Sequence, residues 1–508
     1  MYEIKYAIIM HLHTKQITLM HRIKYGLFIP IACISFSASA GIIEHFNTIK
    51  SDPKALYAFF KGMPTGGELH YHFDGSSSPE TMLSFAARGD YCLDPETFTL
   101  SHFKTVCHDL TAKQLLKNQP RFEQTIRAWS MKDFSRSKGS PINHFYSAFA
   151  KAGTIQSDFD THLLANIMER AANQHELYLE MIALHLEDDK KYAKLIQSAA
   201  NMAEKKRILL ANPDFQNSIN RSIHESNRLL TQSRKILDCD SMPEKAACSL
   251  TVKFQYYVNR EESLDQVFAQ ALAGFVTATQ SNDIVGVNMV GAEHGVICLH
   301  DYKAHMDMFN FMHTAYPKVH IALHAGEISP RLAKPKDLSF HIHDAVFTGQ
   351  AERIGHGVDI THEDDLTNLL NYMAKKPVAV EINLTSNREL LNIYGKKHPL
   401  RFYLKHHVPV VLSTDDEGIL RTDLTHEYVD AVIGHKLDYP TIKAINRNTL
   451  TYSFLPGKSL WADAQKQIIV PECQHLSSTV CQAFIKESLK ATLQWTLEEK
   501  LRGFETSY

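Results

Sequence analysis

GELHYHFDG, residues 67–75, has the length and the turn-forming end of a short β-strand, and it carries two histidines, His70 and His72. Residues two apart on a strand point to the same face, so this strand would direct both imidazoles to one place. Such a pair is a weak signal on its own. It indicates a metal or proton-transfer site only if other segments bring similar groups to the same place.

Seven further short apolar runs bounded by turn residues follow this segment, and most are succeeded by sequence with helical periodicity. Several are apolar on both faces, as strands buried in a parallel sheet must be. Eight such strands with intervening helices predict an α/β fold, the TIM (β/α)8 barrel, whose chemistry lies at the carboxyl ends of the strands. The seven runs are 176–184, 252–258, 284–291, 319–327, 353–357, 378–384 and 408–416.

The spacing of these strands is uneven. Residues 76–175 and 185–251 separate the first three strands, whereas a crossover between parallel strands needs only about 12 residues. We therefore expect helical insertions after strands 1 and 2, and extra helices in residues 424–508. Because no internal repeat or low-complexity linker divides the chain, residues 41–508 are predicted to form a single elaborated barrel domain.

Nitrogen and carboxylate groups recur at the ends of the predicted strands. The fifth strand ends in His324 and Glu327, the sixth carries His356 between two glycines, and the eighth ends in Asp415 and Asp416. Three histidines and one carboxylate from such a set would suit a Zn²⁺ ion that keeps a water ligand, which is the open coordination of a catalytic ion. The alternative, that each is an ordinary turn residue, is reasonable for one position but not for the whole set.

The composition is that of a globular protein without a general basic field. Lys and Arg number 54 against 56 Asp and Glu in 508 residues, which argues against nucleic acid or an anionic membrane as partner. A hydrophobic fraction of 44% with 22% charged residues excludes collagen-like, coiled-coil and largely disordered chains.

The first 40 residues have the pattern of a secretory signal peptide. Arg22 and Lys24 precede an apolar stretch that ends at Ala38-Ser39-Ala40, a small-residue cleavage site. The residues before Met20 add nothing that a signal requires, so Met20 is a candidate true start. We expect an exported protein, periplasmic or secreted, with no membrane anchor after the signal is removed.

Seven of the eight cysteines follow the predicted cleavage site, and six of them form close sequence pairs. Export favours disulfide formation. The predicted disulfides are Cys92–Cys107, Cys239–Cys248 and Cys473–Cys481, with Cys298 left as a reduced core residue.

Six sequence blocks follow one another in the order MPTGGELHYHFDG, VGVNMVGAE, HAGE, RIGHG, NLTSN and STDD. Together they resemble the adenosine deaminase family of zinc-dependent purine deaminases. The resemblance extends from about Phe59 to Ile419. Residues 90–170 and 186–250 exceed the minimal form of the family and are more similar to its secreted, growth-factor-type members; their role stays open.

The resemblance implies a ligand set for one Zn²⁺ per chain. The residues at the matching positions are His70, His72, His324 and Asp415. Strand 4 ends without the lysine that normally bridges the ions of two-metal amidohydrolases, which favours a single ion.

The resemblance also assigns roles around the substrate. Glu327 is implied as the acid that protonates purine N1, and His356 as the residue that orients and deprotonates the zinc-bound water. Asp416 would face purine N7, Gly291 would offer its backbone N–H to N3, and Asp74 would lie near the ribose 5′-hydroxyl. All five positions hold the residue type that the family pattern requires.

The implied function is hydrolytic deamination of adenosine, and of 2′-deoxyadenosine, to inosine and ammonia by a zinc-activated water. AMP or an N6-substituted adenine compound is the nearest alternative substrate, but Asp74 should repel a 5′-phosphate. A secreted binding or signalling protein with a vestigial barrel is the alternative from another class; loss of a ligand or of the acid would mark it. A homodimer is compatible with the sequence but not required by it.

Overall fold

The computed structural model describes residues 41–508. The predicted signal peptide, residues 1–40 with the candidate start Met20, lies outside the described residues. Within residues 41–508, no helix combines the length and the apolar character needed to cross a membrane.

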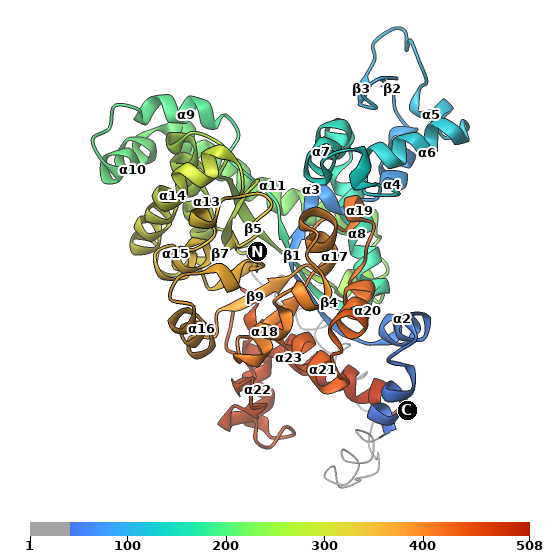
Figure 1. The fold of residues 1–508 in the computed structure, drawn as a ribbon, viewed down its shortest axis with the longest axis vertical. Coiled ribbons are helices and arrows are strands. Elements are labelled where there is room, and N and C mark those ends of the chain that lie inside the picture. Colours follow the sequence, from blue (N-terminus) through green and yellow to red (C-terminus); the bar gives the residue numbers. More distant parts are fainter. Residues whose placement is uncertain (1–40) are drawn as a thin grey trace, which may run out of the picture.

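Eight parallel strands form the centre of the structure (Figure 1). Their side chains are largely buried on both faces, which explains the apolar runs that the sequence shows. Each lies within two residues of its predicted start. The strands are β1 (Thr65–His72), β4 (Glu176–Ile182), β5 (Thr251–Asn259), β6 (Ile284–Val290), β7 (His320–Ala325), β8 (Arg353–His356), β9 (Ala379–Ile382) and β10 (Val410–Leu412).

The strands pair in sequence order, from β1 to β4 and onward to β10, and every pair is parallel. A parallel bridge between Tyr71 and Asp415 joins the first strand to the segment after the last one. The sheet is thereby nearly closed, and the predicted TIM barrel is confirmed.

Helices surround the barrel and bury their apolar faces against it in one large hydrophobic core. Their ends follow local sequence signals. The helix α11, for example, begins at Pro213, and the side chain of Asn212 caps its first free amides. The surrounding helices are α2 (Pro53–Gly62), α8 (Asp160–Asn173), α11 (Pro213–Ile236), α13 (Leu264–Gln280), α14 (Val296–Ala315), α15 (His341–Phe347), α16 (Leu366–Lys375), α18 (Leu400–Lys405), α20 (Leu424–His435), α21 (Tyr439–Tyr452) and α23 (Leu489–Glu505).

The expected insertion after the first barrel strand is present and has an apolar core of its own. That core contains the buried side chains of Tyr91, Leu100 and Trp129, separate from the core of the barrel. The insertion forms the upper right lobe in Figure 1. Its elements are α3 (Phe73–Ser76), α4 (Pro79–Ala86), β2 (Tyr91–Leu93), β3 (Leu100–His102), α5 (Ala112–Leu115), α6 (Gln119–Ala128) and α7 (Pro141–Asp158).

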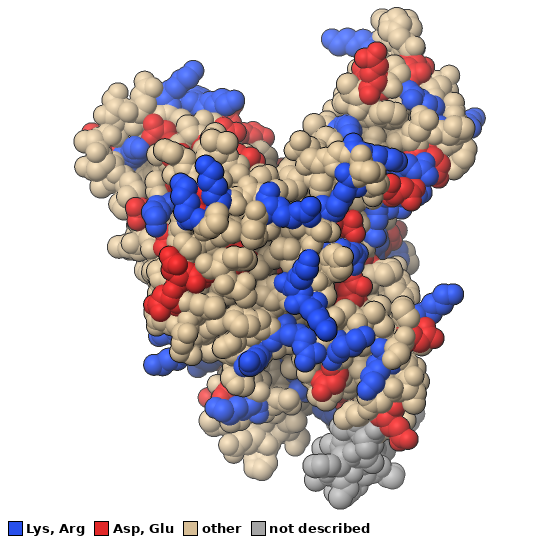
Figure 2. All heavy atoms as spheres, in the orientation of Figure 1, with Lys and Arg blue, Asp and Glu red and all other residues tan. Residues whose placement is uncertain are grey.

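The second expected insertion, after β4, is also present. It contains α9 (Asp189–Ile196), α10 (Met202–Ala211) and the short α12 (Ala246–Ser249), together with α11. Its helices α9 and α10 form the upper left lobe in Figure 1. Figure 2 shows a hollow between the two lobes, with Lys and Arg interspersed among acidic and uncharged residues on this face.

The three predicted disulfides are confirmed, and Cys298 is free and buried. The third bridge, Cys473–Cys481, lies in a small apolar cluster with Leu460 and Ile485 beside α22 (Thr479–Glu487). The C-terminal segment also holds a two-stranded sheet of β11 (Trp461–Asp463) and β12 (Ile468–Ile469). Three disulfides favour an oxidising compartment for this protein.

Replacing both Cys473 and Cys481 with serine should destabilise this cluster, because the unfolded C-terminal segment gains conformational freedom. The bridge lowers the entropy of the unfolded chain by closing a loop, and for a loop of this length its loss should cost about 2.5 kcal/mol in the free energy of unfolding. Urea unfolding of the wild type and the variant, monitored by circular dichroism, measures the loss in the free energy of unfolding. An unfolding curve that superimposes on that of the oxidised wild type would contradict a stabilising role for the bridge.

Candidate functional site

Four side chains predicted as metal ligands converge at the carboxyl ends of the barrel strands. His70 and His72 come from β1, His324 from β7, and Asp415 follows β10. The Nε2 atom of His72 lies 3.1 Å from Nε2 of His324 and 3.3 Å from Oδ1 of Asp415. The Nε2 atom of His70 lies 3.4 Å from the same oxygen. The sequence prediction that these segments meet is therefore correct.

The donor atoms of this cluster fit a bound cation. The Nε2 atom of His70 is fully buried and has no hydrogen-bond partner, although it points to the space between the other three residues. Three imidazole nitrogens and one carboxylate are a donor set that divalent ions such as Zn²⁺ prefer. The cluster can therefore hold a metal ion.

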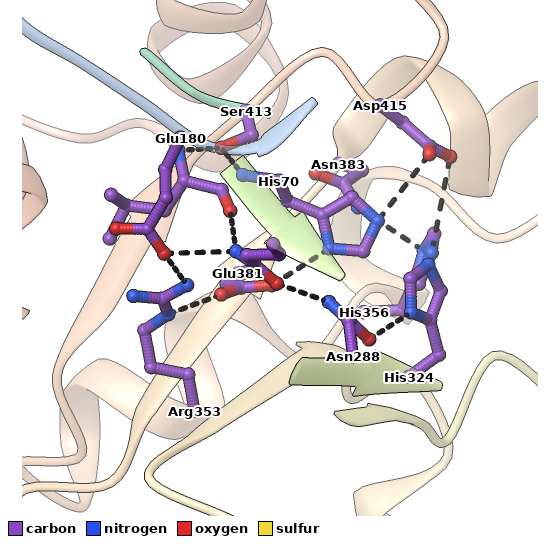
Figure 3. Close-up of polar contacts among 12 residues, drawn as sticks. His70, Glu180, Asn288, His324, Arg353, His356, Glu381, Asn383, Ser413 and Asp415 are labelled. Atoms are coloured by element: carbon purple, nitrogen blue, oxygen red, sulfur yellow. Dashed lines mark hydrogen bonds and ion pairs between the residues drawn. The ribbon is translucent and has the colours of Figure 1, made fainter. Parts of the chain in front are cut away.

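A buried ion pair between Arg353 and Glu381 fixes the ring of His70 through its Nδ1 atom. Its Nδ1 atom donates to Oε2 of Glu381 at 2.8 Å, which leaves Nε2 free for a ligand. Arg353 donates from Nε to Oε1 of Glu381 at 2.6 Å and from a terminal nitrogen to Oε1 of Glu180 at 2.5 Å. Figure 3 shows this guanidinium between its two carboxylates.

The same network reaches His324 from the other side. Gln255 donates to Oε1 of Glu180 at 2.9 Å, so its own oxygen must accept from Asn288 at 2.7 Å. The remaining oxygen of Asn288 then faces Nδ1 of His324 at 2.9 Å. A carboxylate can only accept, so the chain starting at Glu180 fixes the donor in each bond. Both histidines are thus held with Nδ1 protonated and Nε2 directed at the cluster.

Two glycines allow the site residues to approach so closely. A Cβ atom on Gly355 would lie 2.8 Å from the ring of His70, and one on Gly75 would lie 1.6 Å from Oδ1 of Asp416. Both contacts are shorter than any real Cβ atom tolerates. The glycines before His356 and after Asp74 are therefore required by packing.

Glu327 and His356 lie beside the cluster, with Oε2 and Nε2 3.8 Å apart. Burial, and then the charge of Asp415, raise the pKa of Glu327 to about 8, which favours a protonated carboxyl group at neutral pH. Burial lowers the pKa of His356 to about 3. His356 and Asp415 both adopt the left-handed backbone conformation, with φ of 66° and 67°. Such strain in non-glycine residues is typical of functional sites.

The other predicted substrate residues line the same cavity, whose volume is about 300 Å³. Asp416 is buried with Oδ1 unpaired, and burial together with the charge of Asp415 raises its pKa well above the usual range. Asp74 is exposed and forms part of the cavity wall. Gly291 lines the wall with φ of 103°. The structure thus brings together every predicted site residue.

The sequence analysis did not identify the aromatic wall of the cavity. Phe145, Tyr146 and Phe149 of α7 line it, and α7 belongs to the first insertion. Tyr146 keeps 38% of its surface accessible. The helical periodicity of this segment predicted α7, but no local signal shows which face of the helix meets the barrel.

Two further buried residues support the cavity wall and were also missed. Glu293 accepts from the backbone amides of Gly326 and Glu327 at 2.9 and 2.6 Å. Arg260 donates to the carbonyl oxygens of Gly291 and His324, both at 2.9 Å. Glu293 is the last residue of the block VGVNMVGAE, so the resemblance marked its position, but nothing in the sequence indicated that it would accept hydrogen bonds from these backbone amides.

The comparisons with known proteins agree with this geometry. The family model described as adenosine deaminase matches residues 141–467, which is more than half of the chain. The chain belongs to the adenosine deaminase family.

Curated members of the adenosine deaminase family match over shorter stretches. The adenosine deaminase of Klebsiella pneumoniae (strain 342) is 35% identical over 137 residues, which are 27% of this chain and 38% of that protein. That of Escherichia coli (strain SMS-3-5 / SECEC) is 32% identical over 148 residues, 29% of this chain and 41% of that protein. The chain thus spans about two fifths of the length of these relatives.

Solved structures extend the similarity of fold to most of the chain. The N6-methyl-AMP deaminase from Arabidopsis thaliana superposes with a TM-score of 0.51 at 18% identity, covering 81% of this chain and 96% of that one. The arabidopsis ADAL protein complexed with IMP gives a TM-score of 0.53 at 16% identity, covering 88% and 99%. At these identities the similarity shows the fold alone.

Replacing Arg353 with methionine should destabilise the barrel strongly, because Glu180 and Glu381 would remain buried without their cation. We expect a loss of about 3–5 kcal/mol in the free energy of unfolding, measured by chemical denaturation. The control is Arg127→Met, which breaks an ion pair whose partners are 45% and 59% exposed and should cost about 1 kcal/mol or less. Equal losses in the two variants would contradict the assigned role of Arg353.

Proposed function

We propose that this protein is a Zn²⁺-dependent hydrolase that converts adenosine and 2′-deoxyadenosine to inosine or 2′-deoxyinosine and ammonia. The observation that carries the proposal is the meeting of three histidines and Asp415 beside Glu327, a carboxyl group whose pKa burial raises to about 8. Family membership supports the same reaction.

His70, His72, His324 and Asp415 would hold the ion. Bound Zn²⁺ would supply a Lewis acid that lowers the pKa of a coordinated water from about 15.7 to about 7. The protein keeps two ligand histidines in the required tautomer through Glu381 and Asn288, as carboxylate and amide partners commonly do at metal sites.

Glu327 would activate the purine ring. The C6 atom of adenine is a poor electrophile until N1 gains a proton, and a neutral carboxyl group can donate that proton as water attacks. One water hydrogen thereby replaces the proton that Glu327 gives to N1. The other leaves with the amine as the C6–N6 bond breaks, so the products are the 6-oxopurine and ammonia. General acid–base assistance of this kind contributes roughly 10²–10⁴-fold to the rate.

Asp416, Gly291 and Asp74 would orient the nucleoside. Asp416 lines the cavity, and its raised pKa would allow its carboxyl group to donate to purine N7. The backbone N–H of Gly291 would serve N3, and Asp74 would accept from the ribose 5′-hydroxyl. These roles follow the family pattern and are part of the proposal.

The surroundings of Asp74 favour a nucleoside over a 5′-nucleotide. A second cavity of about 550 Å³ begins at Asp74 and Tyr257, which line both cavities. Its wall holds four carboxylates and only two guanidinium groups. One of these, Arg228, is already bonded to Asp160 and Glu225. A 5′-phosphate would therefore meet net negative charge. AMP remains the second candidate substrate because the solved N6-methyl-AMP deaminase has the same fold.

Several observations support an active, exported enzyme over a vestigial barrel. Residues predicted as ligands, as the acid and as substrate contacts lie around one cavity. The signal-like residues 1–40 and the three disulfides support export to the periplasm or beyond the cell. The proposed partner is a small purine nucleoside, and a homodimer stays a prediction from the sequence.

The Glu327→Gln variant should still bind one Zn²⁺ per chain but lose at least about 100-fold in kcat, because an amide cannot supply the proton. His324→Ala should lose zinc and activity together. Metal content measured by mass spectrometry and turnover measured by ultraviolet absorbance separate the two effects. Full activity in Glu327→Gln would rule out the proposed mechanism.

A comparison of adenosine, 2′-deoxyadenosine, AMP and free adenine tests the substrate. We expect the highest kcat/KM for the two nucleosides. Asp74→Asn should raise the AMP-to-adenosine ratio of kcat/KM roughly tenfold, because one repelling charge is removed. The surface variant Asp133→Asn is the control and should leave the ratio unchanged. AMP as the best substrate of the wild type would instead favour the nucleotide alternative.

A further inference from the structure

A chain of hydrogen bonds approaches His356 from the side opposite the metal cluster. It starts at the backbone N–H of Leu400, which donates to Nδ1 of His398 at 3.2 Å. A backbone amide can only donate, so this ring nitrogen must be an unprotonated acceptor. Because His398 is buried, its ring is neutral and carries one proton, which must be on the other ring nitrogen, Nε2.

That proton fixes the orientation of the next side chain. Nε2 of His398 lies 2.9 Å from Oδ1 of Asn387, which accepts the hydrogen bond. The amide nitrogen of Asn387 then faces Nδ1 of His356 at 2.9 Å. The amide nitrogen of Asn383, 3.4 Å away, also faces this atom. The orientation of Asn387 thus follows from an unambiguous backbone donor.

The chain determines which nitrogen of His356 carries the proton. Because Nδ1 accepts from Asn387, the proton of the neutral ring must be on Nε2. Nε2 is the atom that faces the reacting space, 3.8 Å from Oε2 of Glu327 and 3.9 Å from Oδ2 of Asp415. The ligand histidines His70 and His324 are held in the opposite tautomer, with Nε2 bare.

We propose that His398 and Asn387 are positioning residues that lock His356 as the Nε2–H tautomer, so that His356 donates a hydrogen bond to the attacking water. This inference rests on the proposed function. It revises the role that the family resemblance implies, because a ring nitrogen that already carries a proton cannot deprotonate the water. One proton of the water then passes to the carboxylate that Glu327 becomes after protonating N1, which restores the acid, and the other leaves with the departing amine.

The tautomer can be observed directly in the zinc-loaded wild-type protein. Long-range proton–nitrogen NMR correlations of protein labelled with ¹⁵N-histidine distinguish the two tautomers, and the signals that disappear in His356→Gln identify this residue. We expect a protonated Nε2 and an unprotonated Nδ1 at neutral pH. A protonated Nδ1 would overturn the inference. The measurement needs no turnover, so it stands apart from any failure of the proposed deaminase activity.

Asn387→Asp reverses the direction of the hydrogen bond to His356 with almost no change in the shape of the side chain. Both carboxylate oxygens can only accept, so the bond from His398 survives while Nδ1 of His356 must now carry a proton. We expect the NMR signature to change, and kcat for adenosine to fall about 100-fold with KM and zinc content nearly unchanged. An unchanged or increased kcat, with the inverted tautomer present, would show that His356 acts as a base and would overturn the proposal.

His398→Gln is the matched control. Its amide can accept from Leu400 and donate to Asn387, so it preserves the direction of every bond. We expect the wild-type tautomer of His356 and a kcat within about threefold of the wild type. A loss of kcat in this variant as large as in Asn387→Asp, with the tautomer retained, would assign these residues a structural role only.

Discussion

The guanidinium of Arg353 lies buried between the carboxylates of Glu180 and Glu381, and the positions of His70 and His324 follow from this contact. Each carboxylate fixes one histidine. Glu381 bonds His70 directly, and Glu180 orients His324 through the side-chain amides of Gln255 and Asn288. Because a buried ion pair is stable only when both partners are fully hydrogen-bonded, the barrel interior has little freedom to rearrange. The rings of His70 and His324 are thus fixed by side chains that the strands themselves carry.

Neighbouring groups of the site are driven to opposite protonation states. Burial opposes ionisation of Asp415, but the histidines around it hold its pKa far below the usual range. Burial and the charge of Asp415 in turn raise the pKa values of Asp416 and Glu327. One carboxylate can therefore bind a cation while its neighbours remain donors, a separation of roles that acid–base sites require.

The enlarged loops contribute to the cavity as well as to the outline of the molecule. The first insertion supplies the aromatic wall of α7, and its segment after β1 carries Asp74 into contact with both cavities. The sequence located this insertion because its length exceeds that of a crossover. Its inward face depends on how a separate small core packs beside the barrel, which no local pattern encodes. Residue Phe145 therefore looked like any other apolar residue of a helix.

The sequence by itself predicted the barrel, the three disulfides and the meeting of histidine and carboxylate side chains at the strand ends. Apolar runs of strand length are local, and the carboxyl ends of parallel strands must meet, so His70, His324 and Asp415 could be brought together without coordinates. Only the tertiary structure decided which nitrogen of each histidine faces the site. That choice depends on partners such as Glu381 and Asn387, which are hundreds or tens of residues away and matter only through the direction of single hydrogen bonds.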